Sequence, residues 1–427
     1  MREMKDSGVT WVGNIPLTWE MKTIKQLMIE RIEKNKRLEV TTILSLSAKE
    51  GVTLYSSDNH AGNKPREDLS DYKIVRESDI VVNSMNILSG SVGLSKYTGV
   101  VSPVYYIYYP RSNDNVEYFH YIFQSFEFQR SLRGLGNGIL IKESESGGLN
   151  TIRMRIPSKK LGNQEFPYCS RDEQDRIVAA LDASAKKVDT LIANQEAQIE
   201  KLKAYKQSLI AEVVTKGLDP NTPMKDSGVV WIGKIPENWN VNRGKYVLLL
   251  LNRPVEEDDD VITCFRDGEV TLRKNRREDG FTFSEKEIGY QGIEPGDLVI
   301  HGMDGFAGAI GISDSRGKGS PVLIVCDSVY NKQFLEYYLR NLAYRDIFVA
   351  LSTGIRVRSC DLRWNKLAVL PFVLPPIDEQ DRIVEYLSEK LSKVDNLISV
   401  KKTKIEKLNQ YKKSLIYEYV TGKKEVI

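Results

Sequence analysis

Basic and amide side chains gather in the segments of this chain that the sequence predicts to be loops. Arginine and lysine neutralise phosphate groups, arginine pairs in a bidentate way with guanine, and asparagine does the same with adenine. The candidates in the first half of the chain are Lys64, Arg66, Asn83, Asn86, Lys96, Arg133 and Lys142. Those in the second half are Arg273, Lys274, Arg276, His301, Arg316, Lys318, Arg356 and Arg358. Any one of them fits a solvated surface residue better than a base contact, but the set favours a surface that binds DNA.

Residues suited to metal binding form no comparable set in the sequence. The cysteines stand far apart, without the C-x-x-C pairs typical of zinc sites, and no two of the three histidines are close in sequence. Free, buried cysteines in a reducing cytoplasm are the simpler interpretation. We therefore expect no metal site and a cytoplasmic protein.

Three segments are only loosely similar to cofactor, active-site or metal-binding motifs. Residues 305–311 lack the G-x-G-x-x-G spacing of a dinucleotide loop, so a tight turn between strands explains these glycines better. Leu374-Pro375-Pro376 lacks the amide or carboxylate that holds the target amine in amino-methyltransferases. The acidic run 256–260 is interpreted as a solvated loop. We therefore expect neither a cofactor nor catalytic activity in this chain.

Length and composition indicate a protein of two or three domains. The chain has 427 residues, of which 41% are hydrophobic, and its net charge of +3 is too small to argue for or against nucleic acid. Its apolar runs are far shorter than the roughly 20 residues of a membrane span. The charged start MREMKD predicts no secretory signal.

The sequence contains an internal repeat, with two copies of one unit. Residues 4–19 (MKDSGVTWVGNIPLTW) recur as residues 224–239 (MKDSGVVWIGKIPENW), and DEQDRIV at 172–178 recurs at 378–384. Between these blocks the similarity is faint, so the two halves are predicted to share a fold and to differ on the surface. A duplicated enzyme would be expected to repeat its reactive residues, and no such polar cluster repeats. Divergent inserts on a repeated frame favour two readers with different targets.

Two long helices are predicted over residues 171–216 and 377–421, which contain neither glycine nor proline. Their apolar residues recur at alternating intervals of four and three, which is typical of a coiled-coil seam. Both seams are interrupted at equivalent places, Gln195 with Lys401 and Lys206 with Lys412. At ~1.5 Å per residue each helix would span on the order of 65 Å. An antiparallel pair follows if a pseudo-twofold axis relates the copies; the alternative is that each helix packs only on its own domain.

The segments before the helices are predicted to be α+β domains with short strands. Strands are expected near 42–46, 80–83 and 104–109, with counterparts near 261–265, 298–301 and 322–326, and each domain should hold one aromatic-rich helix, near 116–131 and 331–349. The predicted division is 1–170 (variable domain), 171–217 (helix), 218–376 (variable domain) and 377–427 (helix).

Several motifs of this frame are similar to those of one protein family. They are Trp11-Val-Gly-Asn-Ile-Pro16 with Trp19, Trp231-Ile-Gly-Lys-Ile-Pro236 with Trp239, the stretch PFVLPPIDEQ at 371–380, and the DEQDRI start of both helices. Together with the domain order, they resemble the specificity subunits of type I restriction–modification systems over essentially the whole chain. Residues 165–170 of the first half depart from the pattern because they lack the double proline.

The resemblance implies a non-catalytic subunit of a prokaryotic complex that reads a bipartite, asymmetric DNA site, one half-site per variable domain. It also implies two modification subunits, which use S-adenosylmethionine to methylate adenine, and restriction subunits that cleave unmodified DNA. One alternative is a fused nuclease or methyltransferase, which the missing motifs disfavour. Another is a coiled-coil scaffold that binds only proteins, and DNA binding measured at several salt concentrations would separate it from a reader.

Overall fold

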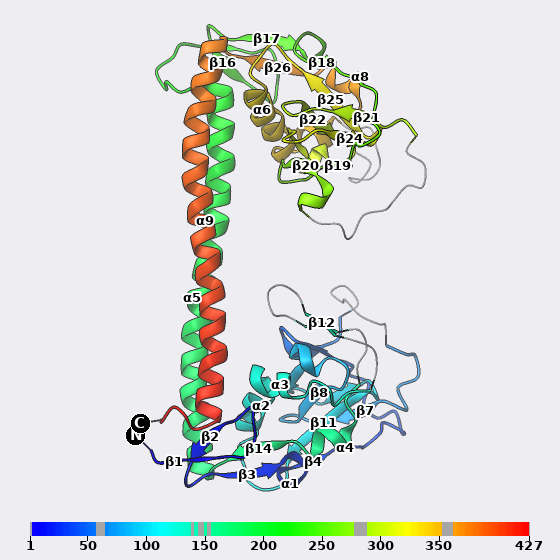
Figure 1. Ribbon diagram of the computed structural model, residues 1–427, viewed down its shortest axis with the longest axis vertical. Helices are drawn as coiled ribbons and strands as arrows, with labels where there is room; N and C mark the ends of the chain where they lie inside the picture. Colours follow the sequence, from blue (N-terminus) through cyan, green and yellow to red (C-terminus); the bar gives the residue numbers. More distant parts are fainter. Residues whose placement is uncertain are drawn as a thin grey trace. The chain divides into compact units, whose positions relative to one another are not determined.

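The computed structural model describes residues 2–56, 65–137, 141–143, 149–151, 155–276, 288–351 and 362–426. The chain divides into two units: unit 1 is Met1–Gln195 with Thr403–Ile427, and unit 2 is Glu196–Lys402. Each unit combines one strand-rich segment with a part of each of two long helices, α5 and α9 (Figure 1).

The centre of unit 1 is an antiparallel sheet in the order β4 (Met28–Glu30), β11 (Tyr105–Pro110), β8 (Ile80–Asn83) and β9 (Val92–Leu94). Every residue of β8 is buried, and its side chains alternate between the two faces of the sheet. Ile80 and Val82 enter one core cluster, while Val81 enters another. The run of β-branched residues at 80–82 suits such a strand, because these side chains pack well on a pleated surface.

The remaining elements of unit 1 cover this sheet. The strand pairs are β1 (Met4–Asp6) with β2 (Asn14–Pro16), β3 (Glu20–Thr23) with β14 (Glu165–Tyr168), β5 (Leu44–Ser47) with β6 (Gly51–Leu54), β7 (Lys73–Val75) with β10 (Gly99–Val101), and β12 (Ile141–Glu143) with β13 (Leu149–Thr151). The short helices are α1 (Ile24–Leu27), η1 (Ile87–Ser89), α2 (Val116–Gln124), α3 (Phe126–Ser131) and α4 (Ser158–Gly162).

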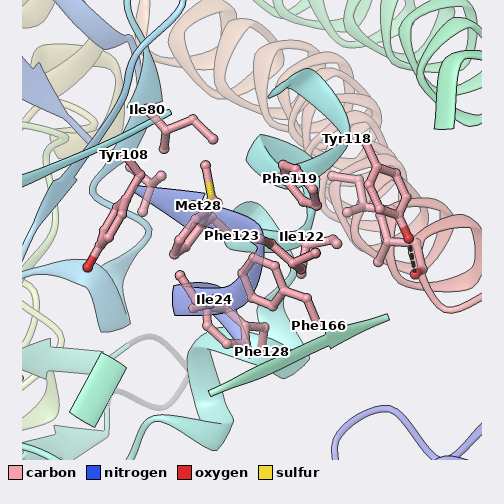
Figure 2. Packing of buried hydrophobic residues seen from close by; sticks show 14 of the residues in the cluster. Ile24, Met28, Ile80, Tyr108, Tyr118, Phe119, Ile122, Phe123, Phe128 and Phe166 are labelled. Atoms are coloured by element: carbon pink, nitrogen blue, oxygen red, sulfur yellow. Dashed lines mark hydrogen bonds between the residues drawn. The ribbon is translucent and has the colours of Figure 1, made fainter. Parts of the chain in front are cut away.

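An aromatic cluster fills the core between the sheet and α2 and α3 (Figure 2). The ring centroids of Phe123 and Phe128 both lie 5.0 Å from that of Phe166, in edge-to-face contacts that favour this packing. The prediction of one helix near 116–131 was wrong, because Ser125 has extended backbone angles (φ −60°, ψ 127°) and separates α2 from α3. The break turns Phe128 of α3 toward Phe123 of α2.

Unit 2 has an antiparallel sheet with the corresponding strand order: β18 (Leu249–Leu250), β25 (Leu323–Asp327), β22 (Leu298–His301) and β23 (Ile310–Ile312). As in β8, side chains of β22 alternate between the two faces of the sheet, since Leu298 and Ile300 belong to one core cluster and Val299 to another. The strands β8 and β22 therefore contribute side chains to a core cluster on each face of their sheets.

The other strand pairs of unit 2 are β15 (Met224–Asp226) with β16 (Lys234–Pro236), β17 (Asn240–Arg243) with β26 (Pro371–Leu374), β19 (Ile262–Cys264) with β20 (Val270–Leu272), and β21 (Gln291–Ile293) with β24 (Gly317–Gly319). Its shorter helices are η2 (Gly244–Tyr246), η3 (Arg273–Asn275), η4 (Gly305–Ala307), α6 (Lys332–Tyr344), α7 (Ile347–Ala350) and α8 (Trp364–Leu367). The prediction of one helix near 331–349 was wrong here too, because Asp346 has a positive φ of 56° and separates α6 from α7.

The long helices are α5 (Arg171–Lys216), which confirms the predicted bounds, and α9 (Ile377–Val420), which ends one residue before the predicted end. In unit 1 the beginning of α5 and the end of α9 contribute to one core cluster, and in unit 2 the end of α5 and the beginning of α9 do the same. Among the described residues, no helix is both long and apolar enough to cross a membrane.

The helix α5 is fastened to the strand-rich part of unit 1 by the DEQD motif at its start. Glu173 accepts a hydrogen bond from the indole Nε1 of Trp19 at 3.0 Å. Gln174 accepts the backbone N–H of Asn115 at 2.8 Å and donates to the carbonyl of Cys169. Asn115 in turn caps α2.

The corresponding contacts recur in unit 2 at the start of α9. Trp239 donates to Glu379 at 3.0 Å, and Gln380 accepts the backbone N–H of Asn331, the cap of α6, at 3.0 Å. Gln380 also donates to the carbonyl of Pro375, as Gln174 does to that of Cys169. The absence of the double proline in residues 165–170 therefore leaves these contacts unchanged.

Polar contacts thus recur at the helix junction of each unit. A cluster of tryptophan, glutamate, glutamine, asparagine and aspartate is present in both units. Its side chains hydrogen-bond one another and the backbone at the two helix junctions. The buried Gln174 and Gln380 and their partners satisfy one another, which holds each junction in a single geometry. The repeated motif fixes the helices to their domains.

Candidate nucleic-acid interface

Two of the predicted contact residues occupy corresponding places in the two units. Asn83 is the last residue of β8 and pairs with Tyr105, while His301 is the last residue of β22 and pairs with Leu323. Both side chains cap the turn that follows. Asn83 Oδ1 accepts the N–H of Met85 at 3.0 Å, and His301 Nδ1 accepts the N–H of Asp304 at 2.9 Å. The frame is thus repeated, but the polar side chain that it presents differs.

In unit 2, several predicted residues come together around one hollow at the end of β22. Its cavity volume is about 730 Å³, and it lies beside the hairpin β19–β20. The polar and charged residues that line it are Thr263, Arg266, Asp267, Arg273, Arg276, His301, Asp304 and Ser320. The structure therefore brings the predicted Arg273, Arg276 and His301 into a single site.

The arginines of this hollow are oriented by carboxylates and by an aromatic ring. Arg276 forms ion pairs with Asp267 and with Glu269, the latter at 2.9 Å, and its guanidinium lies 4.2 Å from the centroid of the Phe265 ring. Arg266 pairs with Asp304 at 2.9 Å. A guanidinium carries five N–H donors, so an arginine paired with a carboxylate still has donors for a ligand.

The pKa of His301 is lowered, mainly because burial disfavours the charged imidazolium. Nδ1 accepts backbone N–H groups of both Met303 and Asp304, so in the neutral ring this network assigns the proton to Nε2. His301 is therefore a neutral side chain that lines the hollow and keeps one donor.

Arg266 is a residue of this site that sequence reasoning missed. It lies in the turn between β19 and β20, separated from Arg273 by a short strand. The antiparallel pairing of Cys264 with Val270 closes the turn that carries Arg266, and both Arg266 and Arg273 line the hollow. The available signal was a basic residue directly after the predicted strand near 261–265.

The predicted Lys274, Arg316 and Lys318 do not line this hollow. Arg316 binds three carboxylates, those of Glu256 and Asp259 at 2.7 and 3.1 Å and that of Glu294. Lys274 pairs with Asp260, and the backbone N–H of Lys318 donates to the carbonyl of Asp260. Residues 256–260 form a loop that is exposed except at the buried Asp259, as expected, and three of its carboxylates also hold basic side chains of neighbouring segments.

In unit 1, a smaller hollow of about 280 Å³ lies beside Ser102 and Pro103, the counterparts of Ser320 and Pro321 in the repeat. The predicted Arg66 lines it together with Lys34, which sequence reasoning did not single out. The backbone N–H of Arg66 donates to the Tyr72 hydroxyl at 3.1 Å, while its side chain is exposed.

The other predicted residues of unit 1 are dispersed. Asn86 is exposed just before η1, Lys96 lines a separate hollow beside α2, and Arg133 is half-buried after α3. Lys142 lies in β12. The predicted Lys64, Arg356 and Arg358 fall outside the described residues.

Over the described ranges, no group of three or more histidine, cysteine, aspartate or glutamate residues could hold a metal ion. Cys169, Cys264 and Cys326 are buried free thiols, and burial raises the pKa of Cys169 and of Cys326 to about 12. Thiols that are this hard to ionise are poor nucleophiles and poor metal ligands.

The glycine-rich segment 305–311 packs as a turn against a neighbouring hairpin. A Cβ on Gly311 would lie 1.8 Å from the carbonyl oxygen of Gly268, and Gly308 has a φ of +92°. The counterpart Gly93 is similarly close to Val52. These glycines are needed for close backbone approach, which supports the interpretation of a tight turn between strands.

Comparison with known proteins gives relatives over most of the chain. The type I restriction enzyme MjaVIII specificity subunit of Methanocaldococcus jannaschii is 24% identical over 287 residues, which cover 64% of each chain. The putative MjaX specificity subunit of that organism is 22% identical over 284 residues, which cover 64% of this chain and 62% of that subunit. The predicted resemblance to type I specificity subunits is confirmed.

The fold is also shared with a solved structure. A chain from a structure that describes complex assembly and conformational transition of the type I R-M system matches with a TM-score of 0.65 and 14% identity, covering 95% of this chain and 98% of that one. No family model matches the sequence. The mixed helix and strand fold of this relative of the type I specificity subunits is thus established.

Proposed function

We propose that this chain is the DNA-recognition subunit of a type I restriction–modification complex and reads a bipartite, asymmetric site. The observation that carries the proposal is the corresponding sheet order of the two units, which present different polar side chains, Asn83 and His301, at corresponding strand ends. Two similar frames with different contact residues suit two unlike half-sites. The curated relatives are themselves named specificity subunits.

The proposed readers are residues 1–170 and 218–376, and the helical segments 171–217 and 377–427 serve as the spacer between them. Arg66, Asn83, Asn86 and Lys96 are the proposed contacts of the first reader, together with the predicted Lys64, Arg133 and Lys142. Arg273, Arg276 and His301 are those of the second, together with the predicted Arg356 and Arg358. Lys274, Arg316 and Lys318 are left out of the base-reading surface because they lie outside the hollow, and two of them are held in ion pairs.

We further propose that α5 and α9 pair as an antiparallel coiled coil, in keeping with a pseudo-twofold repeat. Within unit 2, Lys206 pairs with Asp395 and Gln198 with Lys401, so partner numbers fall along α9 as they rise along α5. Within unit 1, Lys412 pairs with Asp189. Lys206 and Lys412 are the equivalent polar interruptions of the predicted seams, and ion pairs at such positions can fix register.

Chemistry is proposed to reside in partner subunits. Two modification subunits would methylate adenine and restriction subunits would cleave DNA, while this chain would contribute recognition in the cytoplasm. The cysteines described here are buried thiols of high pKa, which fits a role without a cysteine nucleophile.

DNA binding by the purified chain, together with its modification subunits, tests the proposal. We expect an affinity for DNA that contains the complex's target site at least about a thousandfold above that for unrelated DNA. The logarithm of the binding constant should fall linearly with the logarithm of the salt concentration. A complex that assembles but binds all DNA equally, or not at all, would support the protein-only scaffold.

A further inference from the structure

We infer that the hollow at the end of β22 reads a guanine in the half-site bound by unit 2, with His301, Arg266 and Arg276 as the specificity-determining residues. This inference rests on the proposed function and goes beyond it by naming the base and the groups that select it. The hollow is a single site built from the hairpin β19–β20, from Arg273 at the start of η3 and Arg276 just after it, and from the end of β22.

The basic side chains that line the hollow carry mainly hydrogen-bond donors. Arg266, Arg273 and Arg276 are donors only, and His301 keeps Nε2–H because Nδ1 is engaged by two backbone N–H groups. In the major groove guanine presents two acceptors, N7 and O6, side by side, whereas adenine combines an acceptor with a donor and cytosine presents a donor. A donor-rich site therefore selects guanine.

The carboxylates of the hollow are already engaged. Asp267 holds Arg276, and Asp304 holds Arg266 at 2.9 Å. They are thus less available to accept from the amino group of cytosine or adenine, and they fix the planes of the guanidinium groups. The ring of Phe265 under Arg276 adds a second restraint on that side chain. Such preorganisation suits bidentate pairing, for which the guanidinium plane must be set.

Unit 1 presents a different site at the corresponding place. Its strand ends with Asn83, whose Oδ1 is used within the turn, and the basic residues near Ser102 are Lys34 and Arg66. Among the described residues, the hollow with three arginines is therefore found in unit 2 and not at Ser102 of unit 1. The guanine contact should belong to one half-site and should differ from the base at the equivalent position of the other.

The test uses the full complex with modification subunits and oligonucleotides in which each guanine of the site is replaced, one at a time, by 7-deazaguanine. This analogue lacks the N7 acceptor but keeps O6 and its base pairing. For the wild type we expect a loss of affinity of about 10-fold at one guanine of one half-site. The Arg276→Lys variant should bind the natural site more weakly and should show no further loss at that guanine, because lysine keeps the charge but not the bidentate fork.

Two further variants separate recognition from stability. His301→Asn places the residue of unit 1 in unit 2 and can still cap the turn through Oδ1, so it should change the base preference at one position only. Lys274→Ala, a neighbouring basic residue outside the hollow, should leave the preference at every position unchanged. The unfolding midpoint of each variant shows whether it is folded.

The outcomes distinguish the inference from the proposed function. A bipartite site that is bound tightly, but whose binding is insensitive to 7-deazaguanine at every position, would overturn the guanine contact alone. So would an equal deazaguanine effect in the wild type and Arg276→Lys. A complex without sequence preference would instead overturn the proposed function.

Discussion

At the scale of single residues, the two tryptophans of the repeated motif make equivalent hydrogen bonds, but the glutamates that accept them differ in their other contacts. Trp19 and Trp239 are fully buried and each donates its indole N–H to a glutamate at 3.0 Å. Glu173 has an additional ion pair with Arg2, while Glu379 receives its other side-chain contact from Asn238 at 3.4 Å. Removing the indole should therefore harm unit 2 more than unit 1.

We predict that Trp239→Phe lowers the free energy of unfolding by about 1–3 kcal/mol, the range for a buried hydrogen-bonding group that loses its partner. Trp19→Phe is the matched variant and should be the milder of the two, because Arg2 still engages Glu173. Urea unfolding followed by circular dichroism measures both. Equal losses, or a larger loss for Trp19→Phe, would show that the glutamate contacts are not what distinguishes the junctions.

His120 of α2 gives a prediction about pH. Burial lowers its pKa to about 4, and its Nε2 is buried without a hydrogen-bond partner among the described residues. In the unfolded chain the pKa is about 6.5, so between pH 6.5 and pH 4 the unfolded state binds more protons. Above pH 6.5, His120 has no effect on the pH dependence of the free energy of unfolding. As the pH falls from 6.5 toward 4, His120 lowers this free energy by at most ~1.4 kcal/mol per pH unit.

The comparison that isolates this effect is wild type against His120→Gln, which cannot titrate in this range. As the pH is lowered from 7 to 5, the variant should gain stability relative to the wild type in urea unfolding. Parallel pH dependences of the two proteins would contradict a depressed pKa at His120.

The sequence predicted part of the candidate site at this scale. Arg273, Arg276 and His301 were singled out from residue type, and the structure brings them to one hollow. Arg66 also lies at a hollow. By contrast, the three carboxylates around Arg316 come from segments up to 60 residues away, and no local pattern shows that they will meet it. Residue type predicts chemistry, but partners distant in sequence decide whether a charge is available.

At the scale of elements, the long helices were the most predictable part of the fold. Seam spacing over more than 40 residues and a glycine after each helix leave few alternatives, and the start and end of α5 agree with the prediction. The aromatic helices were less predictable. Ser125 and Asp346 interrupt them because packing of Phe128 and Phe348 into the cores outweighs the preference for a continuous helix.

The proposed pairing of the helices predicts an energetic coupling between Lys206 and Asp395. Lys206→Glu should destabilise unit 2, and Lys206→Glu with Asp395→Lys should restore part of the loss. The coupling should be ~0.2–1 kcal/mol, since both side chains are partly exposed. A double-mutant cycle by urea unfolding measures it, and the pair Lys412 with Asp189 in unit 1 provides an equivalent cycle. Zero coupling in both cycles would favour helices that pack only on their own domains.

At the scale of the whole molecule, the spacer proposal predicts that helix length controls the distance between half-sites. We would insert seven residues into α5 between Gln195 and Glu196, and seven into α9 between Lys402 and Thr403, so that both seams keep their spacing. Seven helical residues add about 10 Å, so the half-sites should move apart by about three base pairs while their bases stay the same. Insertion into α5 alone is the control and should abolish fixed spacing because the seams lose register. Altered half-site bases with an unaltered spacer would show that the helices do not measure DNA.

The central claim is that one chain reads two unlike half-sites for a methylating complex. The measurement that tests it most directly is genome-wide mapping of methylated adenines in cells that express this chain with its modification subunits, compared with cells that lack only this chain. We expect one motif with two different half-sites separated by unspecified bases, and its loss when the chain is absent. A continuous palindromic motif, or the same motif with and without the chain, would contradict it.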